Sequence, residues 1–296
     1  MRVSKLRGLE DYIRNLYLSG FTCDEIKELL YKRFNINISS SGVYYFLVKL
    51  GVPMRRRGYR VFYPPHFGKI TIPKSYIMGV LIGDGCIECR EKGKSSTSYQ
   101  IWLKCKDYWF AYAFKRMIEI QYNKKVRLVE KYFTSNLTPT PTKFYFIITY
   151  GKAIVYDLLS FVNYDRTKYV WWGWTVPDVI FDSDVNIKTT FLRGFADSDG
   201  SVRVSRNRKK KRISIFFYSK NKSGLKDIQK LLADLKIRSN IYKVNKDNVY
   251  GCLISRKKSV IRYAKLIGFY HSLRRYKLYS SIETFYNLKI VPPRYP

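Results

Sequence analysis

Two ten-residue segments of this chain nearly repeat each other, and this repeat constrains the fold more than any other feature. Residues 77–86 read IMGVLIGDGC, and residues 192–201 read LRGFADSDGS. Each segment places small residues four positions apart, namely Gly79 and Gly83, and Gly194 and Ser198. Residues four apart share one face of an α-helix, and small residues on that face let two helices approach closely. The repeat therefore predicts two helices that pack against each other within the chain.

Both segments end in Asp-Gly. We expect Gly85 and Gly200 to adopt the left-handed conformation that ends a helix, which leaves Asp84 and Asp199 on the last turns. A helix C-terminus carries partial negative charge, so two neighbouring aspartates there repel each other unless a cation lies between them. The pattern predicts a divalent-metal site with Asp84 and Asp199 as ligands, with Mg²⁺ as the cofactor and Mn²⁺ able to substitute.

The charge of the chain indicates its partner. There are 56 Lys plus Arg residues against 22 Asp plus Glu, a formal net charge of +34. Such an excess favours a polyanion, because neutralising phosphates releases counterions. No apolar run approaches the roughly 20 residues that span a bilayer, and no signal peptide opens the chain. We therefore expect a nucleic-acid-binding protein of the cytoplasm, associated with the nucleoid, or of an organelle matrix in a eukaryotic host, with no membrane partner.

Residues 1–58 are predicted to form three helices. The first covers about 9–18, a capping box of Thr22 and Glu25 opens the second, and the third covers about 40–50. Three short helices followed by a basic arm resemble a helix-turn-helix DNA-binding module. The predicted DNA contacts of this module are Tyr44, Tyr45 and Lys49 on the third helix and Arg55, Arg56, Arg57 and Arg60 in the arm. A plain helical cap with a solvated basic tail is the alternative.

The same order of elements follows each Asp-Gly, which indicates a true duplication. The first copy is predicted to have strands near 86–90 and 98–105, a helix at 107–120, strands near 125–133 and 143–149, and a helix at 152–161. The second copy is predicted to have strands near 201–206 and 211–219, a helix at 223–235, strands near 238–244 and 249–255, and a helix at 258–267. Each copy, with its motif helix, is thus an αββαββα unit.

Strand alternation separates a core face from a polar face. In the first copy, Ile101 and Leu103 are assigned to the core, so Trp102 and Lys104 point the other way. Lys106 follows Asp84 at nearly the same spacing as Lys220 follows Asp199. Both lysines are therefore expected on the polar face, although a solvated lysine at a strand end is the simpler interpretation of each.

With these paired motifs and the duplicated order, the chain resembles a LAGLIDADG homing endonuclease of the monomeric, two-repeat form. The resemblance covers residues 74 to about 286. It implies an α+β fold in which two pseudo-symmetric αββαββα repeats form a saddle over double-stranded DNA. It also implies a metal-dependent, site-specific endonuclease that hydrolyses phosphodiesters and is encoded within an intron.

The resemblance implies roles for individual residues. Asp84 and Asp199 fall on the metal-binding positions, and Lys106 and Lys220 fall on the family's basic catalytic positions. Cys105 and Ser219 stand where a polar partner of each lysine is common, and Ile82 replaces an acid that Asp197 retains, so an asymmetric site is expected. The residues expected to contact DNA on the strands and loops are Glu88, Arg90, Gln100, Trp102, Lys104, Arg203, Ser205, Arg208, Lys209, Arg212 and Ser214.

The predicted domains are a helix-turn-helix module (1–58), a basic, proline-containing linker (59–73), repeat 1 (74–165), an inter-repeat linker (166–189) and repeat 2 (190–290). Two other functions remain open. The chain could be an RNA maturase for its host intron, because members of this family can bind RNA, or a transcription regulator that keeps the fold without catalysis. An intein is not expected, since the chain ends lack splice-junction residues.

Overall fold

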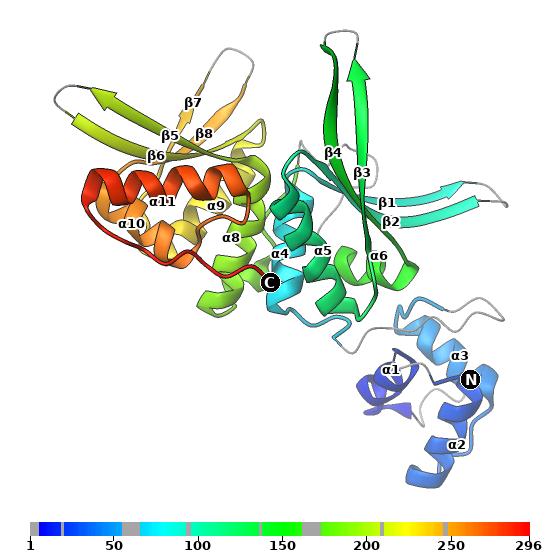
Figure 1. Ribbon diagram of the computed structural model, residues 1–296. Helices are drawn as coiled ribbons and strands as arrows, with labels where there is room; N and C mark the ends of the chain where they lie inside the picture. The colour runs from blue at the N-terminus through cyan, green and yellow to red at the C-terminus, as the bar shows by residue number, and fades with distance from the viewer. Residues whose placement is uncertain are drawn as a thin grey trace. The chain divides into compact units, whose positions relative to one another are not determined.

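The computed structural model describes residues 6–18, 21–54, 66–92, 96–135, 138–161, 173–207, 210–244 and 248–296. The chain divides into two compact units (Figure 1). The first unit is Met1–Phe67 with Lys152–Ile154, and the second unit is Gly68–Gly151 with Val155–Pro296. None of the described helices is both long and apolar enough to cross a bilayer.

The first unit contains the three helices expected from the sequence: α1 (Glu10–Leu18), α2 (Cys23–Phe34) and α3 (Ser40–Lys49). The predicted capping box opens α2, because the Thr22 hydroxyl accepts from the Glu25 amide and the Thr22 amide donates to the Glu25 carboxylate. The apolar sides of the helices meet in a core formed by Leu6, Ile13, Tyr17, Ile26, Leu30, Val43, Phe46, Leu47 and Val52. The unit thus has its own hydrophobic centre.

Residues 72–266 contain two copies of the predicted element order, which confirms the α+β fold. The first copy runs α4 (Ile72–Ile82), β1 (Gly85–Lys92), β2 (Ser96–Cys105), α5 (Tyr108–Tyr122), β3 (Arg127–Ser135), β4 (Thr138–Tyr150) and α6 (Lys152–Leu159). The second runs α8 (Val185–Asp199), β5 (Gly200–Asn207), β6 (Lys210–Ser219), α9 (Lys222–Asp234), β7 (Asn240–Lys243), β8 (Tyr250–Ile254) and α10 (Lys257–Leu266). Two further helices, α7 (Asp178–Phe181) and α11 (Ser272–Tyr286), are additions that the sequence analysis did not predict.

The motif helices begin earlier than expected. α4 begins at Ile72, within the residues assigned to the first linker, and α8 begins at Val185, within the residues assigned to the second. Side chains before each helix explain the difference, because Thr71 accepts from the Lys74 amide and Asp184 accepts from the Asn186 and Ile187 amides. Both are N-cap interactions that start a helix.

The prediction that Gly85 and Gly200 adopt the left-handed conformation was wrong. Gly200 is extended (φ −79°, ψ 157°), and Gly85 has no positive φ; each opens a strand. Glycine is needed for space instead. A Cβ on Gly200 would lie 2.3 Å from the Ala196 carbonyl oxygen, and one on Gly85 would lie 3.0 Å from the Leu81 Cα. The Asp-Gly turn therefore folds the strand back tightly against its own helix.

Each copy contains one antiparallel four-stranded sheet. The strand orders are β1-β2-β4-β3 and β5-β6-β8-β7. The predicted alternation is confirmed, because Ile101 and Leu103 are fully buried whereas Trp102 and Lys104 remain partly exposed. In Figure 1 the helices of each copy lie on one side of its sheet, with α9, α10 and α11 under β5 and β6. The other face of each sheet carries the polar residues.

The motif helices α4 and α8 lie side by side at the junction of the two copies (Figure 1). Their predicted small residues make the contact. A Cβ on Gly79 would lie 2.2 Å from the Phe191 carbonyl oxygen, and one on Gly194 would lie 2.3 Å from the Tyr76 carbonyl oxygen. These distances are far below any tolerated carbon–oxygen contact, so the two backbones touch directly. The helix contact brings the ends of both motifs together.

Candidate active site

Asp84 and Asp199 meet where α4 and α8 end. Asp199 is the last residue of α8. Asp84 was expected on the last turn of α4. It lies instead in the turn that leads into β1, because α4 ends at Ile82. A Cβ on Gly83 would lie 3.2 Å from the Asp199 Oδ2 atom, so the Asp199 carboxylate rests against the residue next to Asp84. The two carboxylates thus share one site.

The surroundings of the two carboxylates disfavour their negative charge. Burial raises the pKa of Asp199 to about 7, with a further increase from the charge of Asp84. Burial also raises the pKa of Asp84 at the turn. The guanidinium of Arg274 opposes both shifts. The site therefore lacks positive charge relative to its two acids.

This donor set fits a hydrated divalent cation. Oxygen ligands from two carboxylates are those that Mg²⁺ accepts, with water and substrate oxygens for the remaining positions. A cation between the acids would remove the mutual repulsion that raises the pKa of Asp199. Within the described parts of the chain, no group of three or more His, Cys, Asp and Glu side chains gathers as ligands. Asp84 and Asp199 are thus the candidate metal ligands among the described residues, and the sequence motifs point to the same pair.

Arg274 is a site residue that the sequence analysis missed. It comes from α11, and its guanidinium donates to the carbonyl oxygens of Ala196 (2.9 Å) and Asp197. These carbonyls belong to the last turn of α8, where a cation is favoured by the helix dipole. Arg274 thus fixes the end of the helix that carries Asp199.

Asp197 and Ile82 occupy equivalent motif positions, and neither faces the carboxylate pair as a ligand. Both side chains are buried. Asp197 accepts hydrogen bonds from the Tyr76 hydroxyl (2.8 Å) and from the amides of Tyr270 (2.8 Å) and His271 (3.0 Å). Burial raises its pKa to about 6, against the effect of these donors. The extra acid of the second motif therefore anchors the segment before α11.

Asp107 anchors the same segment from the first copy. Its carboxylate accepts from the Phe110 amide at the start of α5 and from the Ser272 amide (3.0 Å). His271 Nδ1 lies 3.3 Å from the same carboxylate, yet burial and the charge of Arg274 lower the histidine pKa to about 4. His271 is thus neutral at pH 7. Asp107 and Asp197 together hold the start of α11, and so Arg274, at the junction of the copies.

Lys106 and Lys220 occupy equivalent places, directly after β2 and β6, and both are exposed. The adjacent Cys105 is buried, and its pKa is raised to about 12, mainly by burial and in part by the charges of Asp107 and Asp84. The end of β2 therefore lies near the carboxylate pair. The Cys105 thiol donates to the Asp107 carbonyl oxygen, so it is not available to orient Lys106.

The polar face of the first sheet brings the predicted contact residues into register. Glu88 pairs with Gln100 and Cys86 pairs with Trp102 across β1 and β2, and the Gln100 amide donates to the Glu88 carboxylate. Lys104 lies over three rings, with Nζ 4.1 Å from the Phe133 centroid and 4.4 Å from that of Phe144. The side chain of Arg90 lies outside the described residues.

The second sheet carries a similar group of residues. Arg203 is exposed and lies over the stacked rings of Phe216 and Tyr218, 4.8 Å from the first centroid. Arg203 pairs with Ser214 and Ser205 pairs with Arg212 across β5 and β6. Ser205 and Arg212 are exposed, but Ser214 is only 8% exposed and offers little surface to a ligand. Arg208 and Lys209 lie outside the described residues.

The predicted contacts of the first unit are only partly described. Tyr44, Tyr45 and Lys49 are exposed on one side of α3, with Tyr45 67% exposed. Arg55, Arg56, Arg57 and Arg60 lie outside the described residues. The helix-turn-helix role of this unit stays a prediction.

A family model agrees with the motif geometry. Residues 186–268, from α8 to the end of α10, match the family described as LAGLIDADG-like domain. The chain contains a LAGLIDADG-like domain. The match covers the second copy, and the first copy has the same element order and sheet topology. Asp84 and Asp199 therefore stand at equivalent places in two copies of one element order, the second of which matches the family model.

Two relatives in sequence are distant. The chain is 26% identical over 194 residues to the ribonucleoside-diphosphate reductase NrdEB subunit alpha of Bacillus subtilis, a match covering 61% of this chain and 16% of that protein. It is 24% identical over 285 residues to "Uncharacterized protein MJ0398" of Methanocaldococcus jannaschii, which covers 93% of each chain. The chain thus spans only a small part of the reductase and nearly all of the second relative.

Solved structures agree with the fold. The homing endonuclease I-WcaI, solved bound to its DNA recognition sequence, superposes with a TM-score of 0.51 at 18% identity, covering 70% of this chain and 85% of that one. A mesophilic variant of the homing endonuclease I-DmoI gives a TM-score of 0.46 at 16% identity, covering 66% and 94%. The superposition with I-WcaI shows that the fold of this chain is similar to that of a homing endonuclease.

Proposed function

We propose that the chain is a site-specific endonuclease that hydrolyses both strands of DNA with a divalent metal. The observation that carries this proposal is the pair of motif carboxylates, Asp84 and Asp199, brought together by the contact of α4 and α8. The fold supports it, because the homing endonuclease I-WcaI with the same architecture was solved on its DNA recognition sequence. Action as a monomer inside the cytoplasm or an organelle, from a gene within an intron, belongs to the same proposal.

The charge and the sheet faces support DNA as the substrate. A net charge of +34 favours contact with many phosphates. The polar faces present cations held on aromatic rings, Lys104 in the first sheet and Arg203 in the second. Residues on such a face reach base edges in the major groove, which admits a two-stranded ribbon. Phosphate contacts fix the register of the protein on the duplex, and these strand residues supply the specificity.

The residues of the site have separable tasks. Asp84 and Asp199 would hold Mg²⁺, or Mn²⁺ in its place; when bound, the ion supplies charge neutralisation at the phosphate and lowers the pKa of water. Arg274 keeps the end of α8, and so Asp199, in position. Lys106 and Lys220, directly after β2 and β6, would stabilise charge that develops on phosphate oxygens.

A double-strand cleavage assay tests the proposal. The wild-type protein is incubated with a plasmid library that carries randomised inserts, and linear products are selected and sequenced with Mg²⁺ and with EDTA. We expect a single consensus site in the linearised fraction, and only with the metal. Linearisation without a consensus, or equally in EDTA, would contradict the proposal.

Substitution of the two site lysines is expected to slow cleavage. Lys106→Met and Lys220→Met each remove a charge beside the developing negative charge, so a loss of about 10- to 100-fold in the single-turnover rate is expected. Lys104→Met, on the same strand but over the Phe133 and Phe144 rings, serves as the matched control and should change binding more than rate. Equal small effects at all three positions would identify the two lysines as ordinary solvated side chains.

Removal of residues 1–60 is expected to weaken DNA binding while the nuclease core stays folded. The second unit has its own buried core, and the removed segment carries four arginines of the predicted basic arm. If about four phosphate contacts are lost, the slope of log K against log salt becomes shallower by roughly three to four units. Binding measured by fluorescence anisotropy across a salt series checks this. An unchanged slope would mean that the first unit is a helical cap without a DNA contact.

RNA binding is a second candidate, favoured by one observation. The stacked Phe216 and Tyr218 rings on the second sheet offer a platform of the kind on which unpaired bases stack. Competition between a selected DNA duplex and the intron RNA of the host gene distinguishes the two. RNA that displaces DNA less than an unrelated transcript of equal length would exclude this function.

A further inference from the structure

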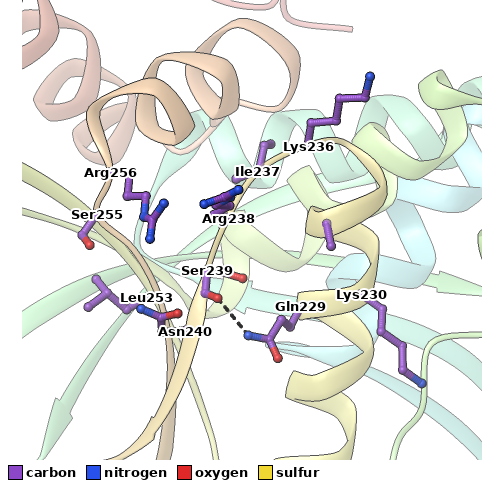
Figure 2. Close-up of a pocket in the computed structure, with 11 residues that line it drawn as sticks. Gln229, Lys230, Lys236, Ile237, Arg238, Ser239, Asn240, Leu253, Ser255 and Arg256 are labelled. Atoms are coloured by element: carbon purple, nitrogen blue, oxygen red, sulfur yellow. Dashed lines mark hydrogen bonds between the residues drawn. The ribbon is translucent and has the colours of Figure 1, made fainter.

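A second basic site lies away from the motif aspartates, on the flank of the second copy. A cavity of about 720 Å³ opens where β7 and β8 separate, between the end of α9 and the start of α10. Four cations are among its lining residues, and no acid is: Lys230, Lys236, Arg238 and Arg256. Figure 2 shows Arg238 and Arg256 near each other, with Lys230 and Lys236 extending outward at the rim. The cavity is therefore a concentration of positive charge without an internal counterion.

The duplication provides an internal comparison for this cavity. α5 and α9 start in the same way, with the side chains of Asp107 and Asn221 accepting from Phe110 and Gly224. Counted from these N-caps, Arg116 corresponds to Lys230 and Glu119 corresponds to Ala233. The equivalent cavity of the first copy is about 330 Å³, and Arg116, Glu119, Asn123, Lys124 and Lys125 are among the residues that line it. The two cavities are thus the same place in two repeats.

In the first copy a carboxylate occupies that place. Glu119 accepts from the Val126 amide (3.1 Å), from Arg116 (2.8 Å) and from Lys115 (3.2 Å). Its pKa is lowered, with the Val126 amide and then Arg116 as the largest favourable contributions against burial. This part of the repeat is therefore built to hold an anion, and the first copy supplies one from its own chain.

In the second copy the carboxylate is gone, Lys230 stands in place of Arg116, and Gln229 stands in place of Lys115. Ala233 is exposed, and the cavity is more than twice as large as that of the first copy. Lys230 has an ion pair with Asp227 at 3.5 Å, whereas no ion pair within the described parts of the chain involves Lys236, Arg238 or Arg256. α10 begins beside the cavity at Lys257, with Arg256 as its N-cap residue, and no side chain caps its amides. An oxyanion would bind both the arginines and this positive helix end.

We propose that this cavity binds a phosphate group in place of the carboxylate that Glu119 supplies in the first copy. Arg238 and Arg256 are the principal ligands, because guanidinium groups bind phosphate oxygens through paired hydrogen bonds. The phosphate belongs either to a small phosphorylated molecule or to a nucleic-acid backbone, which present the same chemistry here. The site binds phosphate whether or not the chain cleaves DNA.

Calorimetric titration with inorganic phosphate tests this site in the full-length protein, at constant ionic strength maintained with chloride. We expect the wild-type protein to show a single site above the nonspecific background. Arg238→Gln with Arg256→Gln should weaken phosphate binding at least about 10-fold, since two charge-assisted hydrogen-bond donors are lost. Lys226→Gln, on the exposed side of α9 and outside the cavity, is the matched control and should leave the titration unchanged.

Exchanging the acid between the copies makes the sharper test. Ala233→Glu places a carboxylate in the second cavity and should abolish the phosphate site. Glu119→Ala empties the first cavity and should create a second site. Both expected results together would demonstrate the equivalence. Phosphate binding that persists in Ala233→Glu would overturn the proposal. Phosphate binding by the arginine double variant that equals wild-type binding would overturn it as well. If Glu119→Ala does not fold, Ala233→Glu still tests the proposal.

DNA binding by the same variants identifies the source of the phosphate. If a backbone phosphate occupies the cavity, the arginine double variant lowers DNA affinity and makes the salt slope shallower by about two units, whereas Lys226→Gln does not. If a small phosphorylated molecule occupies it, DNA binding is unchanged although phosphate binding is lost. If the wild-type protein does not cleave DNA, that result bears only on the proposal for the motif aspartates. The calorimetric test of the phosphate site does not depend on cleavage.

Discussion

Asp199→Asn is expected to abolish DNA cleavage and leave specific binding largely intact. The variant keeps the shape of the side chain but removes one of the two charges that would hold the metal. Loss of metal-assisted catalysis worth several kcal/mol corresponds to a rate decrease of about three orders of magnitude. Asp84→Asn is expected to have the same effect, because each carboxylate alone leaves half of the ligand set. Single-turnover cleavage of a selected target, with binding measured in parallel, checks both.

Asp197→Asn separates a ligand role from an anchoring role. Its side chain accepts hydrogen bonds from the Tyr270 and His271 amides and is not a proposed metal ligand. This variant should therefore lower the free energy of unfolding, while its cleavage of DNA should still require metal. Normal cleavage in Mg²⁺ by either Asp84→Asn or Asp199→Asn would contradict the two-aspartate site.

The same site predicts a pH-dependent stabilisation by Mg²⁺. The pKa of Asp199 is raised from 3.8 to about 7, so the folded protein retains a proton there that the unfolded chain releases. Without metal, this group therefore lowers stability as pH rises towards 7. Mg²⁺ competes with that proton, so the increase in Tm that it produces should be larger at pH 8 than at pH 6. The increase should be absent in Asp199→Asn, and this readout does not require cleavage.

Gly79→Ala is expected to destabilise the second unit severely, although alanine normally stabilises a helix by about 1 kcal/mol relative to glycine. The new methyl group would lie 2.2 Å from the Phe191 carbonyl oxygen, and the obstacle is backbone, which cannot rotate away as a side chain would. Separating α4 from α8 disrupts the largest helix contact of the fold, so we expect a loss of about 4 kcal/mol or more in the free energy of unfolding. Gly194→Ala meets the Tyr76 carbonyl oxygen and should behave alike.

Gly173→Ala is the control for this prediction. A Cβ there meets nothing within 4 Å, so the free energy of unfolding should change by less than about 0.5 kcal/mol. Denaturant unfolding, followed by circular dichroism, compares the three variants. A stable Gly79→Ala protein would show that α4 and α8 do not touch through their backbones.

The motif helices and the repeats could be predicted from the sequence because their signals are local. Spacing of small residues identified the face on which Gly79 and Gly194 meet, and strand alternation separated Leu103 from Lys104. Helix α11 gave no such signal, since it buries only Leu278 and Ile282 and is held mainly by contacts distant in the chain. Arg274 was missed with it, because nothing in its neighbourhood in the sequence marks it as a partner of α8.

The glycines of the two Asp-Gly turns show where local reasoning gave the wrong cause. Glycine at a helix end is most often left-handed, but Gly85 and Gly200 are glycine because a neighbouring backbone occupies the space of a side chain. The role of Asp197 was also beyond the sequence. The sequence showed only that Asp197 keeps an acid where Ile82 stands in the first copy, and its burial with hydrogen bonds from Tyr76 and the two amides made it an anchor.

The sequence by itself determined the duplicated αββαββα order, the paired motif helices and the two aspartates, because periodicity and residue spacing can be recognised within short segments of the chain. Tertiary structure alone decided what surrounds those aspartates: the approach of Asp84, the cap from Arg274, and the hold of Asp107 and Asp197 on the start of α11. It also decided that an anion is supplied internally by Glu119 in one copy and is missing in the other. Charges and amides far apart in the chain act on one another only after folding has removed the water between them.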